Sequence, residues 1–205
     1  MDQKEIQIVK QVLELYKKYG IKSVTMDDVS THMAISKKTL YKYVSDKSDL
    51  VNKVVNYDME KRGVAFKNIF SKPMNAIEEL LEVNKLITEF VVNYNCSMEY
   101  DLQKYYPEIF MKIKKLKREN MFSAIINNLK KGKKEGLYRK NLNEEIITKL
   151  HVFRIENRVE SDQFSPDEIA SPEFINEVFS YHIRGIVNKT GLELFETSNF
   201  ELIKK

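Results

Sequence analysis

Residues 25–50 read TMDDVSTHMAISKKTLYKYVSDKSDL, and this stretch decides the fold. Thr25 followed by Asp28 has the spacing of a capping box, which predicts that a helix begins there. Ser36 and Asp46 are also good N-cap residues, and each precedes apolar residues at helical spacing. The stretch therefore predicts three successive helix starts within a short length of chain.

The first two of these helices have the layout of a helix-turn-helix. A helix over residues 27–33 would brace against the DNA backbone, residues 33–36 would form the turn, and a helix over residues 37–44 would enter the major groove. Leu40 and Val44 lie four residues apart and form the buried side of the second helix, so its polar residues project outward. The hydroxyl and cationic side chains that suit phosphate and base-edge contacts are Thr25, Ser36, Lys37, Lys38, Thr39, Tyr41, Lys42, Tyr43 and Lys47.

Positive charge is concentrated in the same segment. Residues 36–47 contain four lysines and one aspartate, a net charge of +3 in a chain whose net charge is +4. Lys37 falls in the first turn of its helix, where the helix dipole disfavours a cation, so we expect an anion nearby. The helix start after Asp46, with Lys47, forms a second candidate phosphate site. The alternative interpretation is a lysine-rich, solvated helix of an ordinary bundle.

The rest of the chain is patterned for longer helices. Only six glycines and four prolines interrupt 205 residues, of which 42% are hydrophobic. This composition favours long helices around a sizeable core over many short strands. Apolar spacing predicts helices over residues 3–19, 47–70, 74–95, 98–105, 107–134, 143–160 and 173–191, with a loop over residues 161–172. The sequence therefore predicts an all-α fold of about nine helices.

Residues 25–50 closely resemble the DNA-binding signature of the tetracycline-repressor (TetR/AcrR) family of transcriptional regulators. The elements that stand at the family's spacing are Thr25, Val29, Ile35-Ser36, Thr39-Leu40-Tyr41, Tyr43, Lys47 and Leu50, preceded by Tyr19-Gly20-Ile21. The chain departs from the pattern at Ala34, where the family often has glycine, at Ser30, usually alanine, and at Val44, usually phenylalanine. We expect Ala34 to fit the turn, Ser30 to bond back to its own helix, and the neighbours of Val44 to repack.

The resemblance is confined to about residues 1–55, and it implies an organisation for the whole chain. Residues 1–60 would form the helix-turn-helix DNA-binding domain. Residues 61–205 would form a larger helical domain that binds an effector and makes a two-fold dimer.

The segment from Phe90 to Met111 is rich in aromatic residues and methionine, and it falls where TetR-like proteins build their ligand cavity. A tyrosine offers an apolar wall and a hydroxyl, which suits a largely apolar ligand. Our candidate pocket residues are Phe90, Tyr94, Met98, Tyr105 and Phe110. The alternative is that these side chains belong to an ordinary core.

The last two long helices carry apolar stripes, and the second stripe is broad for a helix that touches only its own domain. By the resemblance, these helices would pair across the two-fold axis. The candidate interface residues are Ile146, Leu150, Phe153, Phe174, Val178, Phe179, His182, Ile183 and Ile186. The alternative is a helix buried inside one subunit.

Several other classes of site are disfavoured. The possible soft ligands or nucleophiles, Cys96, His32, His151 and His182, are scattered without metal-ligand spacing, so we expect no metal site and no catalytic centre. No glycine-rich phosphate loop is present, and no cofactor is expected. The basic run over residues 112–134 is interpreted as a solvated helix face, with further DNA or anionic-partner contact as the alternative.

The start of the sequence lacks a secretion signal, and no apolar run reaches the ~20 residues that span a bilayer, so we expect a cytoplasmic protein without membrane contact. The leading hypothesis is a transcriptional regulator, a ligand-responsive repressor that binds a palindromic operator as a homodimer. The alternatives are a helical DNA-binding protein without an effector, and a helical carrier or enzyme.

Overall fold

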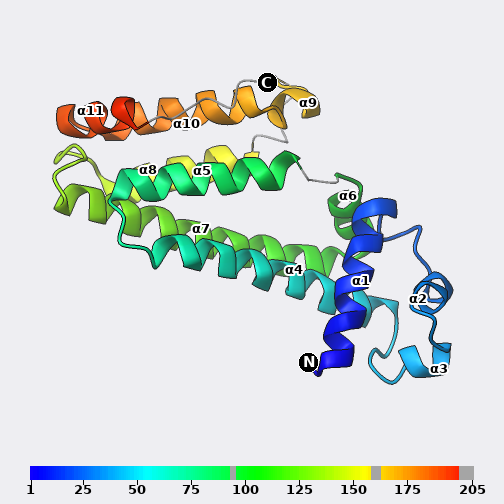
Figure 1. Cartoon of the computed structure of the whole chain (residues 1–205). Helices are drawn as coiled ribbons and strands as arrows, with labels where there is room; N and C mark the ends of the chain where they lie inside the picture. The colour runs from blue at the N-terminus through cyan, green and yellow to red at the C-terminus, as the bar shows by residue number, and fades with distance from the viewer. Residues whose placement is uncertain (93–95, 158–162, 199–205) are drawn as a thin grey trace. The chain divides into compact units, whose positions relative to one another are not determined.

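The computed structural model describes residues 1–92, 96–157 and 163–198. Within these ranges the chain is helical apart from its connections and one isolated bridge between Tyr138 and Val187 (Figure 1). The helices are α1 (Gln3–Tyr19), α2 (Met26–His32), α3 (Lys37–Leu40), α4 (Lys47–Phe70), α5 (Ala76–Val92), α6 (Cys96–Tyr105), α7 (Pro107–Lys134), α8 (Glu144–Asn157), α9 (Pro166–Ile169), α10 (Pro172–Ile186) and α11 (Lys189–Thr197). The predicted all-α fold is confirmed.

The predicted helix over residues 173–191 is wrong at its C-terminal end. α10 stops at Ile186 because the backbone of Val187 is extended and bridges Tyr138. Asn188 then caps a new helix, since its side chain accepts a hydrogen bond from the Gly191 N–H at 3.0 Å. The short helix α9 was also missed, because it lies within the predicted loop over residues 161–172. The described ranges therefore hold eleven helices where nine were predicted.

By packing, the chain divides into two compact units, residues 1–66 with 94–116 (unit 1) and residues 67–93 with 117–205 (unit 2). In unit 1, α1 supplies a continuous apolar stripe to the core. The residues of that core with almost no exposed surface include Ile8, Val9, Val12, Leu13, Tyr16, Leu40, Val44, Leu50, Val51 and Val54. α3 is thus anchored through its apolar side to α1 and α4.

The core of unit 2 combines apolar packing with a buried polar network. The Asn128 amide donates to Glu79 Oε2 at 3.0 Å and to the Ala76 carbonyl at 2.9 Å. Lys131 bonds the same carboxylate, and the Tyr138 hydroxyl donates to Asn128 Oδ1 at 2.9 Å. Burial raises the pKa of Tyr138, which stays a neutral donor. The network joins α5, α7 and the segment after α7.

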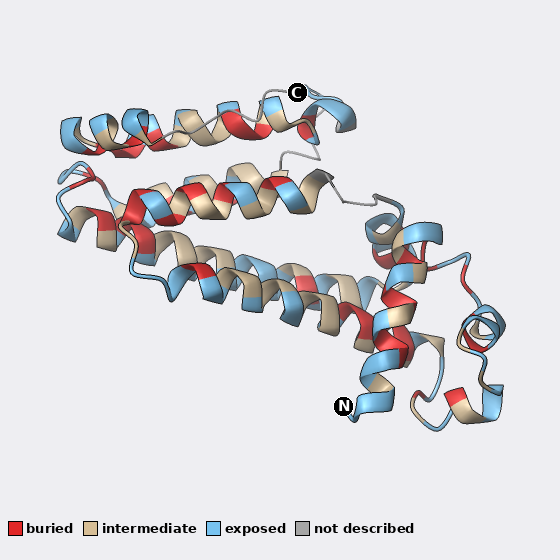
Figure 2. Ribbon diagram, viewed as in Figure 1, coloured by how far each residue is buried: buried red, intermediate tan, exposed pale blue. Residues whose placement is uncertain are grey.

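Most of the helices are amphipathic. Figure 2 shows buried and exposed residues along the same helix in α1, α5 and α10. None of the described helices has both the length and the apolar character that crossing a bilayer requires. The buried apolar residues form the cores of the two units.

Candidate nucleic-acid interface

The start of α2 is a capping box, as the sequence predicts. The Asp28 N–H donates to Thr25 Oγ1 at 3.1 Å, and Asp28 Oδ2 accepts from the Thr25 N–H at 2.8 Å and from its hydroxyl at 2.6 Å. These hydrogen bonds from Thr25 hold the pKa of the Asp28 carboxyl below its ordinary value. Thr25 is exposed at this helix start, so its side chain both caps α2 and faces solvent.

The turn after α2 depends on an unusual backbone conformation. Ala34 has a φ of 51°, in the left-handed region that glycine adopts without a steric penalty. The Ile35 N–H then donates to the Ser30 carbonyl at 3.0 Å. The predicted back-bond of Ser30 is confirmed, because its hydroxyl donates to the Met26 carbonyl at 2.8 Å. The turn therefore closes without glycine, at the cost of strain at Ala34.

α3 is shorter than the predicted helix over residues 37–44. The N–H groups of Lys42 and Tyr43 donate to carbonyls three residues back, which tightens the chain into a turn after Leu40. The Tyr43 carbonyl at the end of this turn accepts from Lys53 Nζ at 2.5 Å. Leu40 and Val44 are buried all the same, as predicted.

The outward side of α3 and of the turn after it carries one lysine that is paired with a carboxylate and two that are not. Lys37 forms an ion pair with Asp27 of α2 at 2.5 Å, so the anion expected beside it is a carboxylate of the neighbouring helix. Lys38 and Lys42 are exposed, and the described residues give neither an ion-pair partner. Tyr41 beside them is 48% exposed. Positive charge therefore faces solvent next to a tyrosine hydroxyl.

Three of the candidate DNA-binding side chains make contacts within unit 1: those of Ser36, Thr39 and Tyr43. The Ser36 hydroxyl accepts from the Thr39 N–H at 3.0 Å, and the two hydroxyl oxygens are 2.9 Å apart. Tyr43 is half-buried against the core of unit 1. These three side chains lie at the edges of the exposed face that Lys38 and Lys42 form.

The candidate phosphate site at the start of α4 is largely occupied by the chain itself. Asp46 Oδ1 accepts from the Asp49 N–H at 2.8 Å, and Asp49 Oδ2 accepts from the Ser45 N–H at 3.0 Å. Lys47 Nζ donates to the Lys22 carbonyl at 3.2 Å, and burial lowers the pKa of this lysine. The free N–H groups expected here are therefore partly satisfied by carboxylates.

Lys53 contacts the end of the turn after α3, and the sequence analysis did not identify this role. Besides the Tyr43 carbonyl, its Nζ contacts Glu5 Oε1 at 2.8 Å and Asp49 Oδ2 at 3.5 Å. Hydrogen bonding to Glu5 raises its pKa. Only the Asp49 contact, at a spacing of four residues, had a local signal in the sequence. One ammonium group thus ties α1 and α4 to the end of the recognition turn.

The structure places the five candidate pocket residues in different surroundings. Met98 and Phe110 pack half-buried on the core of unit 1, Tyr105 is exposed, and Phe90 belongs to α5 of unit 2. Tyr94 lies outside the described residues. Aromatic residues at helical spacing fit core, cavity and surface equally well, so the pattern could not separate these places.

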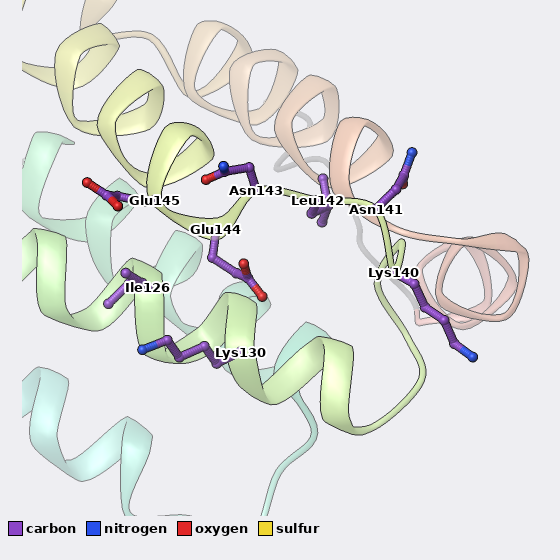
Figure 3. A pocket seen from close by; sticks show the side chains of 8 residues that line it. All are labelled: Ile126, Lys130, Lys140, Asn141, Leu142, Asn143, Glu144 and Glu145. Atoms are coloured by element: carbon purple, nitrogen blue, oxygen red, sulfur yellow. The ribbon is translucent and has the colours of Figure 1, made fainter.

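One hollow in unit 2 has a largely polar lining. Its volume is about 500 Å³, and Figure 3 shows its lining side chains coming from α7, the following connection and the start of α8. These side chains are Ile126, Lys130, Lys140, Asn141, Leu142, Asn143, Glu144 and Glu145. None of the candidate pocket residues belongs to this lining.

The candidate interface residues separate into exposed and buried sets. Ile146, Leu150 and Phe153 of α8 are 55%, 59% and 65% exposed. The half-buried members on α10 are Phe174, Val178, Phe179 and His182. Ile183 and Ile186 are a correction, because both are buried in the core of unit 2 and are out of reach of a second subunit. Tyr181, missed by the prediction, is 76% exposed.

Two of the scattered histidines meet between α8 and α10. His151 Nδ1 lies 3.1 Å from His182 Nδ1 and 3.1 Å from Arg154 Nη2. Because Arg154 can only donate, His151 Nδ1 accepts and the shared proton belongs on His182. Burial lowers the pKa of His151 to about 2 and that of His182 to about 4. Across the described ranges, no three side chains of the kinds that bind metals come together.

The helix-turn-helix segment and the whole chain are similar to known transcriptional regulators. Residues 8–54 match the family model TetR_N, described as bacterial regulatory proteins of the tetR family. The chain is 21% identical over 182 residues to an uncharacterized HTH-type transcriptional regulator, YvaF, of Bacillus subtilis, covering 87% of this chain and 93% of that protein.

Solved structures share the fold over nearly the whole length. A transcriptional regulator from Cytophaga hutchinsonii has a TM-score of 0.72 at 16% identity, covering 91% of this chain and 100% of that one. The ketosteroid transcriptional regulator KstR2 of Mycobacterium tuberculosis has a TM-score of 0.57 at 14% identity, covering 92% and 97%. Residues 8–54 thus carry the helix-turn-helix of the TetR family of DNA-binding transcriptional regulators, and the helical architecture of the chain is shared with solved regulators.

Proposed function

We propose that this regulator is a ligand-responsive repressor that binds a palindromic operator as a homodimer in the cytoplasm. Residues 1–60 would form the DNA-binding domain, and residues 61–205 the effector-binding and dimerisation domain. The observation that carries the proposal is the outward side of α3 and of the turn after it, where Lys38 and Lys42 are exposed without a carboxylate partner in the described chain, while Leu40 and Val44 are buried. Such a face presents unneutralised charge to a polyanion.

The residues of the interface divide by the contacts they suit. Lys38, Tyr41 and Lys42 are exposed, and lysine can reach the O6 and N7 atoms of guanine in the major groove. The remaining members lie at helix starts or at the edges of α3, where contacts to phosphates position a protein on the duplex. These are Thr25, Ser36, Lys37, Thr39, Tyr43 and Lys47.

The proposed dimer rests on the two apolar sides of α8. Val152 and Thr148 are buried inside unit 2, whereas Ile146, Leu150 and Phe153 recur at intervals of four and three residues on the other side and are exposed. A helix with apolar residues on opposite sides is stable when both are covered. We propose that a second copy covers this side, together with Tyr181 and the half-buried residues of α10.

The proposed effector is a small, largely apolar molecule. KstR2, which shares the fold, is described as a ketosteroid regulator, and this supports a ligand of that general chemistry here. The molecule would change operator affinity only if it binds one dimer geometry more tightly than the other. A ligand-dependent rise in melting temperature would distinguish this protein from a DNA-binding protein without an effector.

The decisive experiment is selection of bound DNA from a pool of random duplexes with the full-length protein. A near-palindromic sequence is expected, with half-sites that place two recognition segments in successive major grooves ~34–36 Å apart. Sedimentation of the complex would give two protein chains per duplex. Failure to enrich any sequence would contradict operator recognition, and enrichment of a single half-site would contradict the dimer.

A further inference from the structure

A second group of cations lies in unit 1, around the connection between α1 and α2. The Nζ atom of Lys22 is 4.9 Å from the centroid of the Tyr105 ring, and that of Lys104 is 5.6 Å from the same centroid. Lys104 Nζ also donates to the Tyr100 hydroxyl at 2.9 Å. These four exposed residues, Lys22, Lys104, Tyr100 and Tyr105, form what we call the Lys–Tyr patch.

The charge of the Lys–Tyr patch is not cancelled by a paired carboxylate. Among the described residues, neither lysine has an ion-pair partner within salt-bridge distance. Asp101, whose charge acts on Lys22, is buried, and its Oδ2 accepts from the Lys22 backbone N–H at 2.8 Å. Two ammonium groups that share one aromatic ring repel each other, and an anion that binds between them relieves this repulsion.

The protonation state of the patch favours an anion as well. Hydrogen bonding to Tyr105 raises the pKa of Lys22, so this lysine keeps its charge at neutral pH. Hydrogen bonding to Tyr100 raises the pKa of Lys104 in the same way. The rings also hold both ammonium groups near one point, which reduces the side-chain entropy that binding would remove.

The patch is continuous with the proposed DNA interface. The Lys22 carbonyl accepts from Lys47 Nζ at 3.2 Å, and Lys22 is three residues before Thr25, a span of at most about 11 Å. The end of α6 is fixed to this connection through Asp101. At Gly20, where φ is 80°, a Cβ atom would lie 3.0 Å from Asp101 Oδ2, so the backbone approaches α6 closely.

We propose that Lys22 and Lys104 bind the phosphate backbone of operator DNA, which extends the interface from the helix-turn-helix to the C-terminal end of α6. This inference rests on the proposed function. Duplex DNA carries one negative charge per about 1.7 Å of its axis. Cations beside the helix-turn-helix are therefore close to phosphates whatever the base sequence of the duplex. The ring of Tyr105 lies beside both lysines, and its hydroxyl can donate to a phosphate oxygen.

The test measures the salt dependence of binding for Lys22→Gln and Lys104→Gln. Anisotropy titrations use the selected duplex and a random-sequence duplex of equal length, over a range of salt concentrations. Each lost phosphate contact lowers the slope of log K against log salt by about 0.9, so each variant of the dimer should lower it by about 1.8. The affinity should fall by the same factor on both duplexes, because phosphate contacts carry no sequence information.

Two control variants isolate the role of the patch. Lys22→Arg and Lys104→Arg keep the charge and should keep the wild-type slope. Lys85→Gln removes one exposed lysine from α5 of unit 2 and should leave the slope unchanged. Since Lys22 and Lys104 are exposed, the Gln variants should melt like the wild type, and the Asp101 contact, which uses the Lys22 backbone, is retained.

The outcomes separate this inference from the proposed function. An unchanged slope in both Gln variants, with a lower slope in Lys42→Gln, would overturn the patch and leave operator binding intact. A loss confined to the selected duplex would also overturn it, because it would indicate base readout. If the wild-type protein binds neither duplex, the proposed function itself fails.

Discussion

The ammonium group of Lys37 lies 2.5 Å from the carboxylate of Asp27, so the first cation of α3 is neutralised by the helix before it. Lys38 and Lys42 have no such partner in the described chain. Neighbouring lysines of one short segment therefore differ: the charge of Lys37 is shared with Asp27, while Lys38 and Lys42 carry unneutralised charge.

This difference predicts unequal effects on DNA binding. Lys42→Ala and Lys38→Ala should each weaken operator binding by about 1–3 kcal/mol if they contact bases. Lys37→Ala should weaken operator binding less than either of these variants. It should change the free energy of unfolding by less than about 1 kcal/mol, because the Lys37–Asp27 ion pair is exposed. Asp27→Asn should tighten binding, since it removes a negative charge and releases Lys37. Titration of all four variants on one duplex checks the order, and a Lys37→Ala loss larger than that of Lys42→Ala would contradict it.

The turn at Ala34 predicts a stabilising substitution. An L-residue in the left-handed region costs about 1–2 kcal/mol, and glycine loses about 0.5–1 kcal/mol of backbone entropy on folding, so Ala34→Gly should stabilise by about 0.5–1 kcal/mol. For a chain of this size the melting temperature should rise by a few degrees, on the order of 2–4 °C per kcal/mol. Ala34→Val should lower it, because a branched side chain tolerates this φ least. Equal melting temperatures for all three proteins would argue against strain.

Two buried tyrosines offer a matched pair. The Tyr16 hydroxyl is buried and has no hydrogen-bond partner among the described residues, whereas the Tyr138 hydroxyl donates to Asn128. Tyr16→Phe should therefore stabilise the protein, by about 1 kcal/mol, because it removes an unsatisfied polar group. Tyr138→Phe should destabilise it by about 1–2 kcal/mol, because Asn128 loses a partner. Denaturant unfolding of both variants gives the two signs, and two effects of the same sign would refute the assignment.

The His151–His182 pair predicts loss of stability in mild acid. Both pKa values lie below the ordinary 6.5 in the folded protein, at about 2 and about 4, so the unfolded chain binds protons that the folded chain does not. Stability is therefore complete above about pH 6.5 and falls towards pH 4, by at most about 1.4 kcal/mol per pH unit for each histidine. Over this range, the denaturation midpoint should depend more steeply on pH for the wild type than for the double variant His151→Gln/His182→Gln. His32→Gln, at an exposed position on α2, should keep the wild-type profile.

The exposed side of α8 predicts a variant that cannot dimerise. Leu150→Asp places a charge on that side without disturbing the core, since Leu150 is 59% exposed. Sedimentation velocity should show a monomer with wild-type helicity, and operator affinity should fall because the two half-sites are no longer linked. Lys149→Asp, one residue along and also exposed, is the control and should remain dimeric. A dimeric Leu150→Asp would show that α8 is not the contact.

The parts of the structure that the sequence predicted correctly are those set by local chemistry. The Thr25–Asp28 capping box, the Ser30 back-bond and the burial of Leu40 and Val44 all follow from residues within a few positions of each other. The misplaced features depend on distant contacts. Lys53 reaches the Tyr43 carbonyl from a different helix, a contact that no local pattern indicates.

The same distinction explains the end of α10 and the different surroundings of the candidate pocket residues. Val187 leaves α10 because it bridges Tyr138, a residue far away in the sequence. Tyr105 had the spacing of a cavity residue, but its ring faces solvent under two lysines, and no periodicity distinguishes these environments.

The carboxylate of Glu79 is shared by Asn128 and Lys131, and Asn128 is in turn held by Tyr138. Removing any one of these groups leaves another buried without its hydrogen-bond partner. This destabilises the fold far more than replacing all of them together by apolar residues. The four positions are therefore expected to be inherited as a set. Lineages of this regulator that abandon one member should carry compensating changes at the other three.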